Sequence, residues 1–581
     1  MSENSTDQFF KSTVLGHPAG LFVLFFTEMW ERFSFYGMRA LLVMFFVSTA
    51  ENGGWDWTRE QAMALFGSYV GLVYLSTMMG GYFADKVIGY RWAVVIGALL
   101  MTLGHGSMAL ETPFFIYSGL ILLVFGNGFF KPNMTSIVSE MYKHRPEKKD
   151  GAYTIFYMGV NAGAFLGILL CGYLGEQVGW NWGFGVAGIF MFFGLLQFWL
   201  SQNIFGNIGL KPVKLAVSET DENNDKLNPF STPQLALIGV MVILGLLWII
   251  FEPAKIISEG AVDIFNFEVM GLSGNNFTIL LALVLFIVLL VYRLIRYSQI
   301  TKEKMIAVTF FAFLTIFFWA IFEQSPGSLT IFAKDYTDRV LDGSAATIFK
   351  IINATITIVP LGIITWVLIL LFKQTFKLYA VANIILSLSF VIVWGIAFWM
   401  LSNQFAEESP EVPASWFSTL NSLFIISLAP LFSKWWESKY NPSANFKYAI
   451  GMSLLAIGMI CVAVGADGIL PGAKSASVSM IWLILFYLFA TMAELCISPV
   501  GLSYVSKLVP GRMIAMMFGI WYLAVAIGMK GAAKFGENVD KIANENGMSY
   551  FFWMLAIVSL VVAVLSGIMS PVIKKLMHGV R

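Results

Sequence analysis

The chain contains 581 residues, of which 58% are hydrophobic, 16% are aromatic and only 12% are charged, and its net charge is +1. Soluble domains carry roughly 25% charged residues, so this composition excludes an ordinary soluble globular protein. The charge balance and the lack of a basic segment with interleaved aromatic residues also exclude a nucleic-acid-binding protein, so we expect no nucleic-acid partner.

Apolar runs of about 20 residues recur along the whole chain, which is the length a helix needs to cross a hydrocarbon layer of about 30 Å. The ten-residue alternating segments of outer-membrane barrels are absent from the sequence, and the runs contain the Gly and Ser residues of packed helices. The sequence therefore predicts an all-α polytopic membrane protein in contact with the lipid bilayer. Residues 1–18 lack a charged segment followed by a cleavage site, so we expect no cleaved signal peptide.

Polar breaks divide these runs into sixteen candidate spans. Their cores cover 19–49, 62–84, 91–110, 113–140, 151–174, 183–201, 234–251, 277–298, 305–333, 346–372, 376–402, 415–437, 446–466, 478–508, 512–531 and 550–576. Six spans precede the polar segment 202–233 and ten follow it, so a six-plus-six arrangement requires two further helical pairs. We assign these pairs to 234–298 and 346–402, which carry few charges within their apolar runs.

This count of spans predicts three regions. Residues 1–202 form an N-terminal six-helix bundle, and residues 203–304 form a cytoplasmic linker with an inserted helix pair. Residues 305–581 form a C-terminal six-helix bundle with a second inserted pair at 346–402. Two halves with a substrate site between them are typical of secondary transporters.

The distribution of basic residues predicts the orientation of the spans. The loops at 265–276 and 402–414 contain no Lys or Arg, whereas the loops on the alternate side contain many. Cytoplasmic loops carry an excess of Lys and Arg. We therefore expect a multi-pass protein of the cytoplasmic (inner) membrane with both termini in the cytoplasm.

The first span contains charged residues where an apolar environment makes them costly, at about 2.5–3.5 kcal/mol each near the bilayer centre on insertion scales. At about 100° per residue, one face of this helix contains Glu28, Glu31, Arg32, Phe35, Tyr36 and Arg39. We expect this face to line a polar cavity. The alternative is a structural ion cluster that only fastens helices together.

Three further charges lie in other spans: Lys131 in GNGFFKPN, Glu323 in FFWAIFEQSPGSL and Glu494 in MAELCISPVGLSY. With the first span they give four carboxylates and three cations, so one carboxylate is unmatched. An unmatched carboxylate in a low-dielectric cavity takes up a proton, which is the elementary event of proton coupling, and the count leaves its identity open. His105 also lies in a span, but a lone histidine on an apolar helix is more often structural.

Fixed cations and a separate carboxylate suit a zwitterion of defined length. Its carboxylate would bind Arg32 or Lys131, and its ammonium group would bind Glu494. The side-chain amides of Asn161 in FYMGVNAGAF and Asn421 in WFSTLNSLF could complete the hydrogen bonding. Candidate apolar pocket residues, which could equally serve helix packing, are Tyr36, Tyr74, Trp319 and Trp521.

The sequence contains no pattern typical of a catalytic or metal centre. Cys171, Cys461 and Cys496 are scattered through apolar segments without metal-ligand spacing, so we expect buried thiols, no metal site and no cofactor. No nucleophile and base pair and no nucleotide-binding loop stand out. The sequence thus favours a transporter over an enzyme.

Several motifs resemble those of known transporters. The loop GGYFADKVIGYR, with a charged turn at Asp85, Lys86 and Arg91, resembles the loop motif of the major facilitator superfamily, in which it latches one half during the transport cycle. The segment EMWERFSFYGMRA resembles the ExxERFxYYG motif of the proton-dependent oligopeptide transporter (POT/PTR) family. GNGFFKPN, FYMGVNAGAF, FWAIFEQ, WFSTLNSLF and AELCISPVGLS follow in the order of that family.

The resemblance implies the major facilitator fold and proton-coupled symport of di- and tripeptides by alternating access. It implies a coupling network formed by Glu28, Glu31, Arg32 and Lys131. Arg39 would pair with Glu323, and protonation of Glu323 would break this bridge and let the two halves move. The pair at 234–298 would be the linker hairpin of prokaryotic members, whereas the pair at 346–402 departs from the common bacterial pattern.

For the substrate, the resemblance implies that Glu494 with Asn161 and Asn421 holds the amino end of the peptide, while Arg32 and Lys131 hold its carboxylate. Aromatic pocket positions of the family match Tyr36, Tyr74, Trp319 and Trp521. The expected partners are therefore di- and tripeptides, protons and the bilayer.

Two positions depart from the family pattern. Phe35 stands where the family often has a second Tyr, and Ser422 stands where Pro usually follows the Asn of the eighth core span. These departures concern side-chain preference rather than coupling. Two alternatives to peptide symport stay open: a proton-coupled transporter of another small anion or peptide-like substrate, and a membrane enzyme or peptide sensor built on the same fold.

Overall fold

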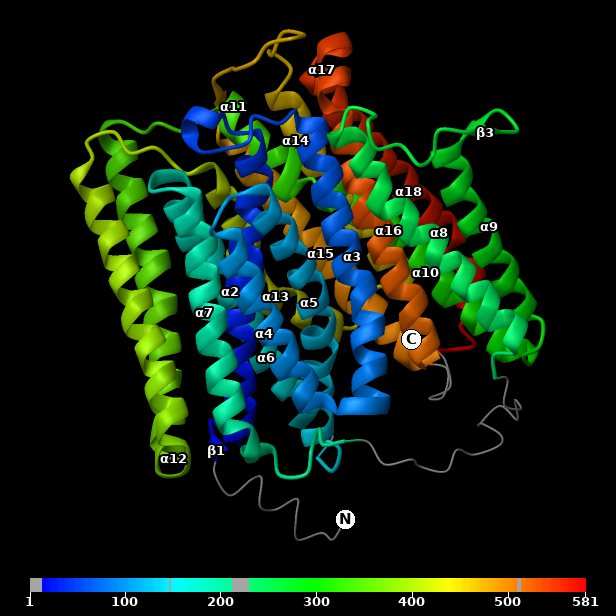
Figure 1. The fold of residues 1–581 in the computed structure, drawn as a ribbon, viewed down its shortest axis with the longest axis horizontal. Helices are drawn as coiled ribbons and strands as arrows, with labels where there is room; N and C mark the ends of the chain where they lie inside the picture. Colours follow the sequence, from blue (N-terminus) through cyan, green and yellow to red (C-terminus); the bar gives the residue numbers. More distant parts are fainter. Residues whose placement is uncertain (1–12, 146–147, 212–228, 509–513, 581) are drawn as a thin grey trace.

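The computed structural model describes residues 13–145, 148–211, 229–508 and 514–580, and its regular structure is almost entirely helical (Figure 1). The long helices are α2 (Ala19–Val47), α3 (Arg59–Phe83), α4 (Tyr90–Met108), α5 (Pro113–Met141), α6 (Lys149–Gln177), α7 (Trp180–Ser201), α8 (Thr232–Ile257), α9 (Gly274–Leu294), α10 (Gln299–Phe322), α12 (Gly343–Ala406), α13 (Thr419–Glu437), α14 (Ala444–Gly465), α15 (Ile481–Leu508), α16 (Ile514–Glu537) and α18 (Met548–Leu576). Shorter helical segments are η1 (Ala50–Asn52), η2 (Ala84–Ile88), η4 (Gln202–Phe205), η5 (Ser325–Leu329), α11 (Thr330–Tyr336), η6 (Ala414–Ser418) and α17 (Val539–Asn546).

Strands in the described ranges are confined to two-residue pairs. The antiparallel pairs are β1 (Thr13–Val14) with β2 (His17–Pro18) and β3 (Glu268–Val269) with β4 (Leu272–Ser273), and the parallel pair is β5 (Thr337–Asp338) with β6 (Val478–Ser479). Each of the sixteen predicted spans overlaps a helix, and α12 contains two of them. The prediction of an all-α polytopic protein is confirmed.

Twelve helical segments in the described part of the chain are long and apolar enough to cross a membrane. The helix α2 is not one of the twelve, because charged side chains interrupt its apolar stretch. The residue boundaries of the three predicted regions, 1–202, 203–304 and 305–581, stay a prediction.

The helices run between two ends of the bundle. We call the end that carries α11 and α17 the upper end and the end that carries β1 the lower end (Figure 1). Helix α2 runs from the lower end to the upper end, and α18 returns to the lower end. The first and last described residues therefore lie at the lower end.

Ion pairs at the upper end join the N-terminal helices, α2 to α7, to the C-terminal helices, α10 to α18. Arg59 at the start of α3 pairs with Asp335 of α11 at 2.8 Å and with Asp540 of α17 at 2.7 Å. Lys334 donates a hydrogen bond to the Ser48 hydroxyl at 3.1 Å. These contacts connect three segments that are far apart in the sequence.

A second set of upper-end contacts joins α6 to η6. The carboxylate of Glu176 accepts hydrogen bonds from the backbone amides of Ala414 at 2.9 Å and Ser415 at 3.0 Å. The indole N–H of Trp416 donates to the Leu169 carbonyl at 3.0 Å. Together with the Arg59 pairs, these bonds hold the upper end of the bundle closed.

Two glycines of α6 let its backbone touch that of α2. A Cβ atom on Gly163 would lie 2.1 Å from the Met29 carbonyl oxygen, and one on Gly167 would lie 2.2 Å from the Phe33 carbonyl oxygen. Such distances are too short for any side chain, so the close approach requires glycine at both positions. This contact fixes the middle of α2 against α6.

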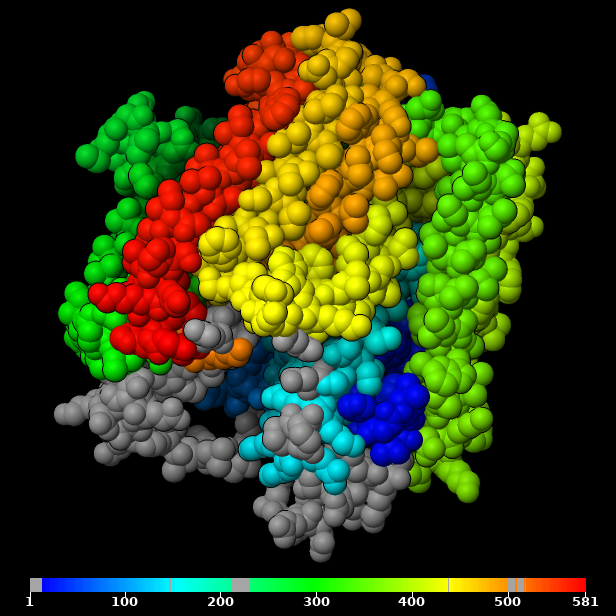
Figure 2. All heavy atoms as spheres, turned by 180° about the vertical axis from the view of Figure 1, so that it is seen from behind, coloured from blue at the N-terminus to red at the C-terminus, as the bar shows by residue number. Residues whose placement is uncertain are grey.

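Two helical pairs lie on opposite flanks of the central bundle. Helices α8 and α9 pack against each other and α8 packs on α3, whereas α12 packs on α7, α6 and α2. Figures 1 and 2, which view the molecule from opposite sides, show α8 and α9 on one flank and α12 on the other. The ring of Phe390 in α12 lies 5.6 Å from the ring of Trp30 in α2, measured between centroids. Thus α12 packs on N-terminal helices although it follows α11 in the sequence.

The predicted break between the two spans of α12, at 373–375, is wrong. Those residues are helical, and the helix path is broken at Tyr379, with φ −131° and ψ 44°. The Asn383 amide donates to the Tyr379 carbonyl and to the Thr375 hydroxyl, both at 2.9 Å. Asn353 and Gln404, near the two ends of α12, are hydrogen-bonded at 2.6 Å, so the two arms form a hairpin. These side-chain hydrogen bonds stabilise the turn between the two arms. A hydropathy pattern does not show such bonds, so it could not place the turn.

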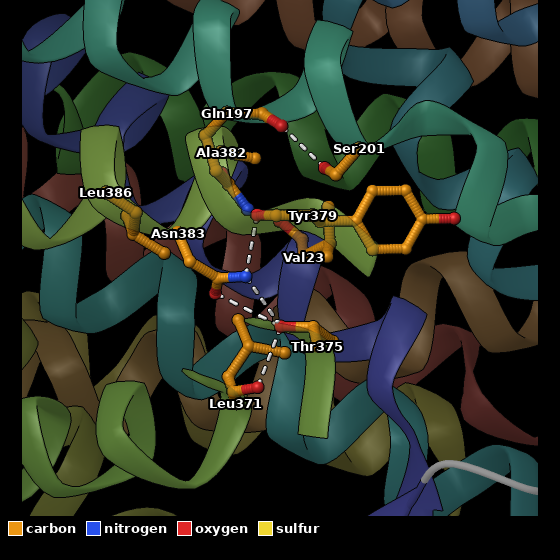
Figure 3. Close-up of a pocket in the computed structure, with 9 residues that line it drawn as sticks. All are labelled: Val23, Gln197, Ser201, Leu371, Thr375, Tyr379, Ala382, Asn383 and Leu386. Atoms are coloured by element: carbon orange, nitrogen blue, oxygen red, sulfur yellow. Dashed lines mark hydrogen bonds between the residues drawn. The ribbon is translucent and has the colours of Figure 1, made fainter. Parts of the chain in front are cut away.

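A cavity of about 10 Å³ lies where α12 meets α2 and α7 (Figure 3). It is lined by Val23, Gln197, Ser201, Leu371, Thr375, Tyr379, Ala382, Asn383 and Leu386. Its volume is about that required for one water molecule. The cavity lies in the interface that holds α12 to the bundle, and no residue predicted to bind substrate or protons lines it.

The predicted span 305–333 is not a single helix. Helix α10 ends at Phe322, the π-helical turn η5 follows, and α11 begins at Thr330. Pro326 lies in this turn and lacks the backbone N–H that a regular helix would use. Breaks of this kind frequently occur at functional sites. Here the break places Glu323 at the C-terminal cap of α10.

Candidate functional site

The charged residues of α2 are buried and paired with one another. Arg32 Nε lies 2.8 Å from Glu28 Oε1 and 2.9 Å from Glu31 Oε2. The exposed fraction of each of these three residues is 3% or less. One guanidinium between two carboxylates leaves the group short of positive charge when both carboxylates are ionised.

Lys131 of α5 supplies positive charge next to this group. Its ammonium interacts electrostatically with Arg32, Glu31 and Glu28. The same ammonium lies 4.4 Å from the centroid of the Tyr74 ring, a cation–π contact that compensates in part for lost hydration. The structure therefore brings together the four residues predicted to form the coupling network.

An ion pair connects α2 to the helix break after α10. Arg39 Nη2 lies 2.5 Å from Glu323 Oε2, and both side chains are more than 90% buried. The Arg39 guanidinium also lies 5.4 Å from the centroid of the Tyr36 ring. The pairing implied by the sequence motifs is present, and its role in coupling stays a prediction.

The break at η5 is tethered to the C-terminal helices. The Gln324 side-chain amide donates to the Ala532 carbonyl of α16 at 2.8 Å. The Ser325 hydroxyl donates to the hydroxyl of Tyr487 in α15 at 2.9 Å. Glu323 is therefore positioned by C-terminal helices, whereas its partner Arg39 belongs to an N-terminal helix. The ion pair thus connects the N-terminal helices to the C-terminal helices.

Glu494 of α15 has a different environment from Glu323. Its Oε2 accepts a hydrogen bond from the Asn421 amide at 2.9 Å, and Asn421 also donates to the Thr491 hydroxyl at 3.1 Å. Among the described residues, no ion pair involves Glu494. Glu494 is thus the carboxylate that has no cation partner when the four carboxylates and three cations of the sequence are paired, and its hydrogen-bond partner is the Asn421 amide.

Tyr36 lies between these groups. Its hydroxyl interacts electrostatically with Arg32, Arg39, Glu494 and Glu323. Because these residues come from α2, α10 and α15, charged groups of the N-terminal and C-terminal helices meet around one phenol. These charged residues therefore form one group rather than separate pairs. We call the group the central cluster; it consists of Glu28, Glu31, Arg32, Arg39, Lys131, Glu323 and Glu494.

The other predicted site residues have contacts of their own. The Asn161 amide donates to the Tyr157 carbonyl of the same helix at 2.9 Å, so this hydrogen bond does not lead to Glu494. The Trp319 ring packs 5.1 Å from the Phe318 ring between centroids, and Trp521 is 95% buried with an exposed fraction of 5%. Phe318 and Trp319 are neighbours in α10, so this ring contact says nothing about a pocket, and the pocket roles of these residues stay a prediction.

A second buried cluster of charges was missed in the sequence count. Lys530 Nζ of α16 lies 2.8 Å from Glu252 Oε2 of α8 and 3.9 Å from Glu537 Oε1. Lys534 pairs with both carboxylates. Glu252 lies directly after the predicted apolar run 234–251 and was not counted among the charges of the spans. The segments WIIFEPAKII and GMKGAAKFGE contain the signal, a charge within an apolar run, that identified the first span.

The central cluster can bind a ligand that has two opposite charges. It contains cations on α2 and α5 and, on α15, a carboxylate that forms no ion pair within the described part of the chain. Charge-assisted hydrogen bonds to such groups are stronger and more directional than neutral ones. Among the described residues, no group of three or more metal-ligating side chains is present.

Comparison with known proteins identifies the family. The POT family profile matches residues 91–218 and 387–554. The peptide transporter YePEPT of Yersinia enterocolitica is 32% identical over 91% of this chain and 89% of its own length. This chain belongs to the POT family.

Two other transporters extend this comparison. The di-/tripeptide transporter of Lactococcus lactis subsp. cremoris is 29% identical, over 98% of this chain and 99% of its own length. A crystal structure of a POT family transporter in complex with a thioalcohol-conjugated peptide is 25% identical, with a TM-score of 0.71 over 98% of this chain and 100% of the other. The family likeness therefore extends over nearly the whole chain, although the family profile itself leaves residues 219–386 unmatched.

The comparison confirms three predictions from the sequence. The protein is a POT family member, it has a polytopic fold of the major facilitator type, and it is a transporter rather than an enzyme. With its twelve apolar helical segments in the described residues, it is a multi-pass membrane protein.

Proposed function

We propose that this POT protein is a proton-coupled symporter of di- and tripeptides in the cytoplasmic membrane, working by alternating access. The names of its relatives support peptides as the substrate class. The observation that carries proton coupling is the buried Arg39–Glu323 ion pair, because it joins an N-terminal helix to a break tethered to C-terminal helices.

The coupling step is the protonation of Glu323. When Glu323 takes up a proton, Arg39 loses its counter-charge in a buried place, which is costly. A state in which the two sets of helices move apart around Arg39 then becomes more favourable. The ion pair reforms when the proton leaves, so the direction of the proton gradient sets the direction of net transport.

The substrate site uses the rest of the central cluster. Glu494, with Asn421 and Asn161, holds the amino end of the peptide, and Arg32 and Lys131 hold its carboxylate. Glu28 and Glu31 balance these two cations when the site is empty. The aromatic residues proposed to bound the side-chain pockets are Tyr36, Tyr74, Trp319 and Trp521.

We assign the upper end to the outside of the cell and both termini to the cytoplasm. The positive-inside rule supports this orientation, since 265–276 and 402–414 lack Lys and Arg and connect helices at the upper end. With the upper end closed by the Arg59 and Glu176 contacts, the described conformation is one in which exchange with the outside is blocked.

Uptake of labelled dialanine into proteoliposomes with an acidic exterior tests the coupling step. We expect the parent protein to accumulate dialanine, and Glu323→Gln to lose uphill uptake while it keeps exchange of internal for external peptide. Gln cannot change its charge, so movement of the helices no longer requires a proton. Glu545→Gln, an exposed substitution on α17, is the matched control and should accumulate peptide like the parent. Undiminished accumulation by Glu323→Gln would remove Glu323 from the coupling role.

A peptide-like conjugate is a second candidate substrate. The relative solved with a thioalcohol-conjugated peptide supports this candidate, because such a ligand keeps the peptide backbone and changes the side group. Competition of each compound against labelled dialanine, at equal concentration and pH gradient, ranks the two classes. The candidate fails if conjugates do not reduce dialanine uptake.

A further inference from the structure

The cluster formed by Glu252, Lys530, Lys534 and Glu537, in which only the Lys534 side chain is partly exposed, lies outside the central cluster. We name it the flank clamp, because Glu252 belongs to α8 of the flanking pair and the other three residues belong to α16. The exposed fractions of Glu252 and Lys530 are both 3%. Two lysines and two glutamates balance in charge, so no counter-ion from solvent is needed.

Helix α8 is attached to an N-terminal helix above and below Glu252. The Gln61 amide of α3 donates to the Ile257 carbonyl of α8 at 3.4 Å. A Cβ atom on Gly71 of α3 would lie 2.9 Å from Ile249 Cδ1, so the helices touch there as well. The part of α8 that carries Glu252 is therefore packed against α3, whereas the ion-pair partners of Glu252 are on α16.

Lys530 of α16 contacts both α8 and α3. It pairs with Glu252 of α8 at 2.8 Å, and it donates hydrogen bonds to the Ser68 hydroxyl at 2.9 Å and the Ala64 carbonyl at 3.3 Å, both on α3. The flank clamp thus ties α16, a C-terminal helix, to α3 directly and through α8.

The position of the flank clamp relates it to the closed upper end. Glu537 is the last residue of α16, and Ser68 lies within three turns of Arg59 at the start of α3. Arg59 makes the ion pair with Asp540 that closes this end. Any motion that parts α3 from α16 at the upper end must separate the buried Lys530 from Ser68 and from Glu252.

We propose that the flank clamp is a gating contact, in which the α8–α9 pair holds α16 against α3 and so favours the conformation with a closed upper end. This inference rests on the proposed alternating-access transport. Its physical basis is that Glu252 and Lys530 are almost fully desolvated, so losing their mutual contact is costly unless the helices stay together. The α8–α9 pair would then be part of the moving machinery rather than a passive linker.

The test measures the width of the upper end by distances between two spin labels. The labels are placed at Glu51→Cys in η1 and Glu545→Cys in α17, both exposed positions, in a background whose three native cysteines are replaced by alanine. The variants are Glu252→Gln and the charge-balanced double variant Glu252→Gln with Lys530→Gln. Glu268→Gln, an exposed residue on the loop of the same helical pair, is the matched control.

We expect both clamp variants to raise the ratio of long to short label distances by about tenfold, which corresponds to about 1.4 kcal/mol, and the control to leave the ratio unchanged. If Glu252→Gln fails to fold because Lys530 is left uncompensated, the double variant decides the result. An unchanged ratio in the folded double variant overturns the proposal. Failure of the double variant to fold also overturns it, because the cluster would then support the fold in every state. The measurement uses neither peptide nor a proton gradient, so its outcome is independent of peptide symport.

Discussion

At the residue scale, two carboxylates of the central cluster, the buried Glu323 and the partly buried Glu494, differ in their partners. Glu323 contacts a guanidinium at 2.5 Å, whereas Glu494 contacts a neutral amide at 2.9 Å. A carboxylate that is already neutralised by an arginine attracts a ligand ammonium weakly, whereas one that has only an amide partner lacks a counter-charge that a ligand ammonium can supply. This difference supports the proposal that Glu323 is the proton switch and that Glu494 binds the amino end of the substrate.

The assignment of Glu494 predicts a selective loss in Glu494→Gln. Peptides with a free amino end should compete about tenfold or more weakly against labelled dialanine, since a hydrogen bond to a charged group contributes about 1.5–3 kcal/mol. Amino-blocked peptides, which lack the ammonium, should be affected much less. The readout is the half-inhibitory concentration of each peptide under one imposed pH gradient. An equal loss for both classes would contradict the assignment.

Residues with an isolated charge in an apolar run were predictable from the sequence. Glu28, Glu31 and Arg32 were expected to be buried and functionally grouped, and their distances of 2.8 and 2.9 Å show that they are grouped. Glu252 and Lys530 carry the same signal and were missed, because their partners lie in spans far apart in the sequence. A one-dimensional pattern marks a buried charge but does not name the residue that compensates it.

At the element scale, the site depends on close contact between α2 and α6. Gly163 and Gly167 face the carbonyls of Met29 and Phe33 without room for a methyl group. Arg32 lies between these two contacts along α2, so a shift of the helix would displace its guanidinium from the carboxylates. The position of the charged triad is therefore set by two residues that carry no charge.

This contact predicts that Gly163→Ala and Gly167→Ala lower thermal stability and dialanine uptake. Each added methyl must push the two backbones apart, and overpacking of this kind costs about 1–3 kcal/mol. Gly362→Ala and Gly395→Ala in α12 are matched controls, because a Cβ atom there would meet nothing within 4 Å. The unfolding midpoint and the uptake rate of each purified variant provide the comparison. Equal behaviour of the α6 and α12 variants would rule out a tight contact between α2 and α6.

Helices were easier to predict than the places where they break. All sixteen spans overlap helices, because a run of about 20 apolar residues leaves few other possibilities in a bilayer. The interruption at η5 and the reversal at Tyr379 depend instead on hydrogen bonds to residues of other turns or helices. Hydropathy does not show such bonds. It therefore predicts one helix over 305–333 and places the break of α12 at 373–375 instead of at Tyr379.

At the scale of the whole molecule, contacts from several helices close the upper end. Arg59, Lys334 and Glu176 each join an N-terminal helix or loop to a C-terminal one. Each contact is modest by itself, since partly exposed ion pairs contribute about 0.2–1 kcal/mol. Contacts of this size can break and re-form, which the proposed alternating access requires.

Alternating access predicts that a covalent bridge at the upper end stops transport. The variant Ser48→Cys with Lys334→Cys, in a background without native cysteines, places two thiols on opposite sides of the contact that Lys334 Nζ now makes with Ser48 Oγ at 3.1 Å, separated by about the length of the lysine side chain. Treatment with a short bifunctional thiol reagent should abolish dialanine uptake, and reduction should restore it. The two single-cysteine proteins, treated in the same way, are the controls. Continued uptake by the bridged protein would contradict opening of the upper end during transport.

The placement of α12 links the two parts of the chain in the order of their synthesis. Its residues are made after α11, yet its rings and its water-sized cavity are shared with α2 and α7. During biogenesis, the lipid-facing side of α7 therefore stays uncovered until a hairpin more than a hundred residues later has entered the bilayer. A fragment that stops before Gly343 would expose this side of α7. A chimaera whose C-terminal part lacks α12 would likewise lose the helices that cover this side of the N-terminal bundle.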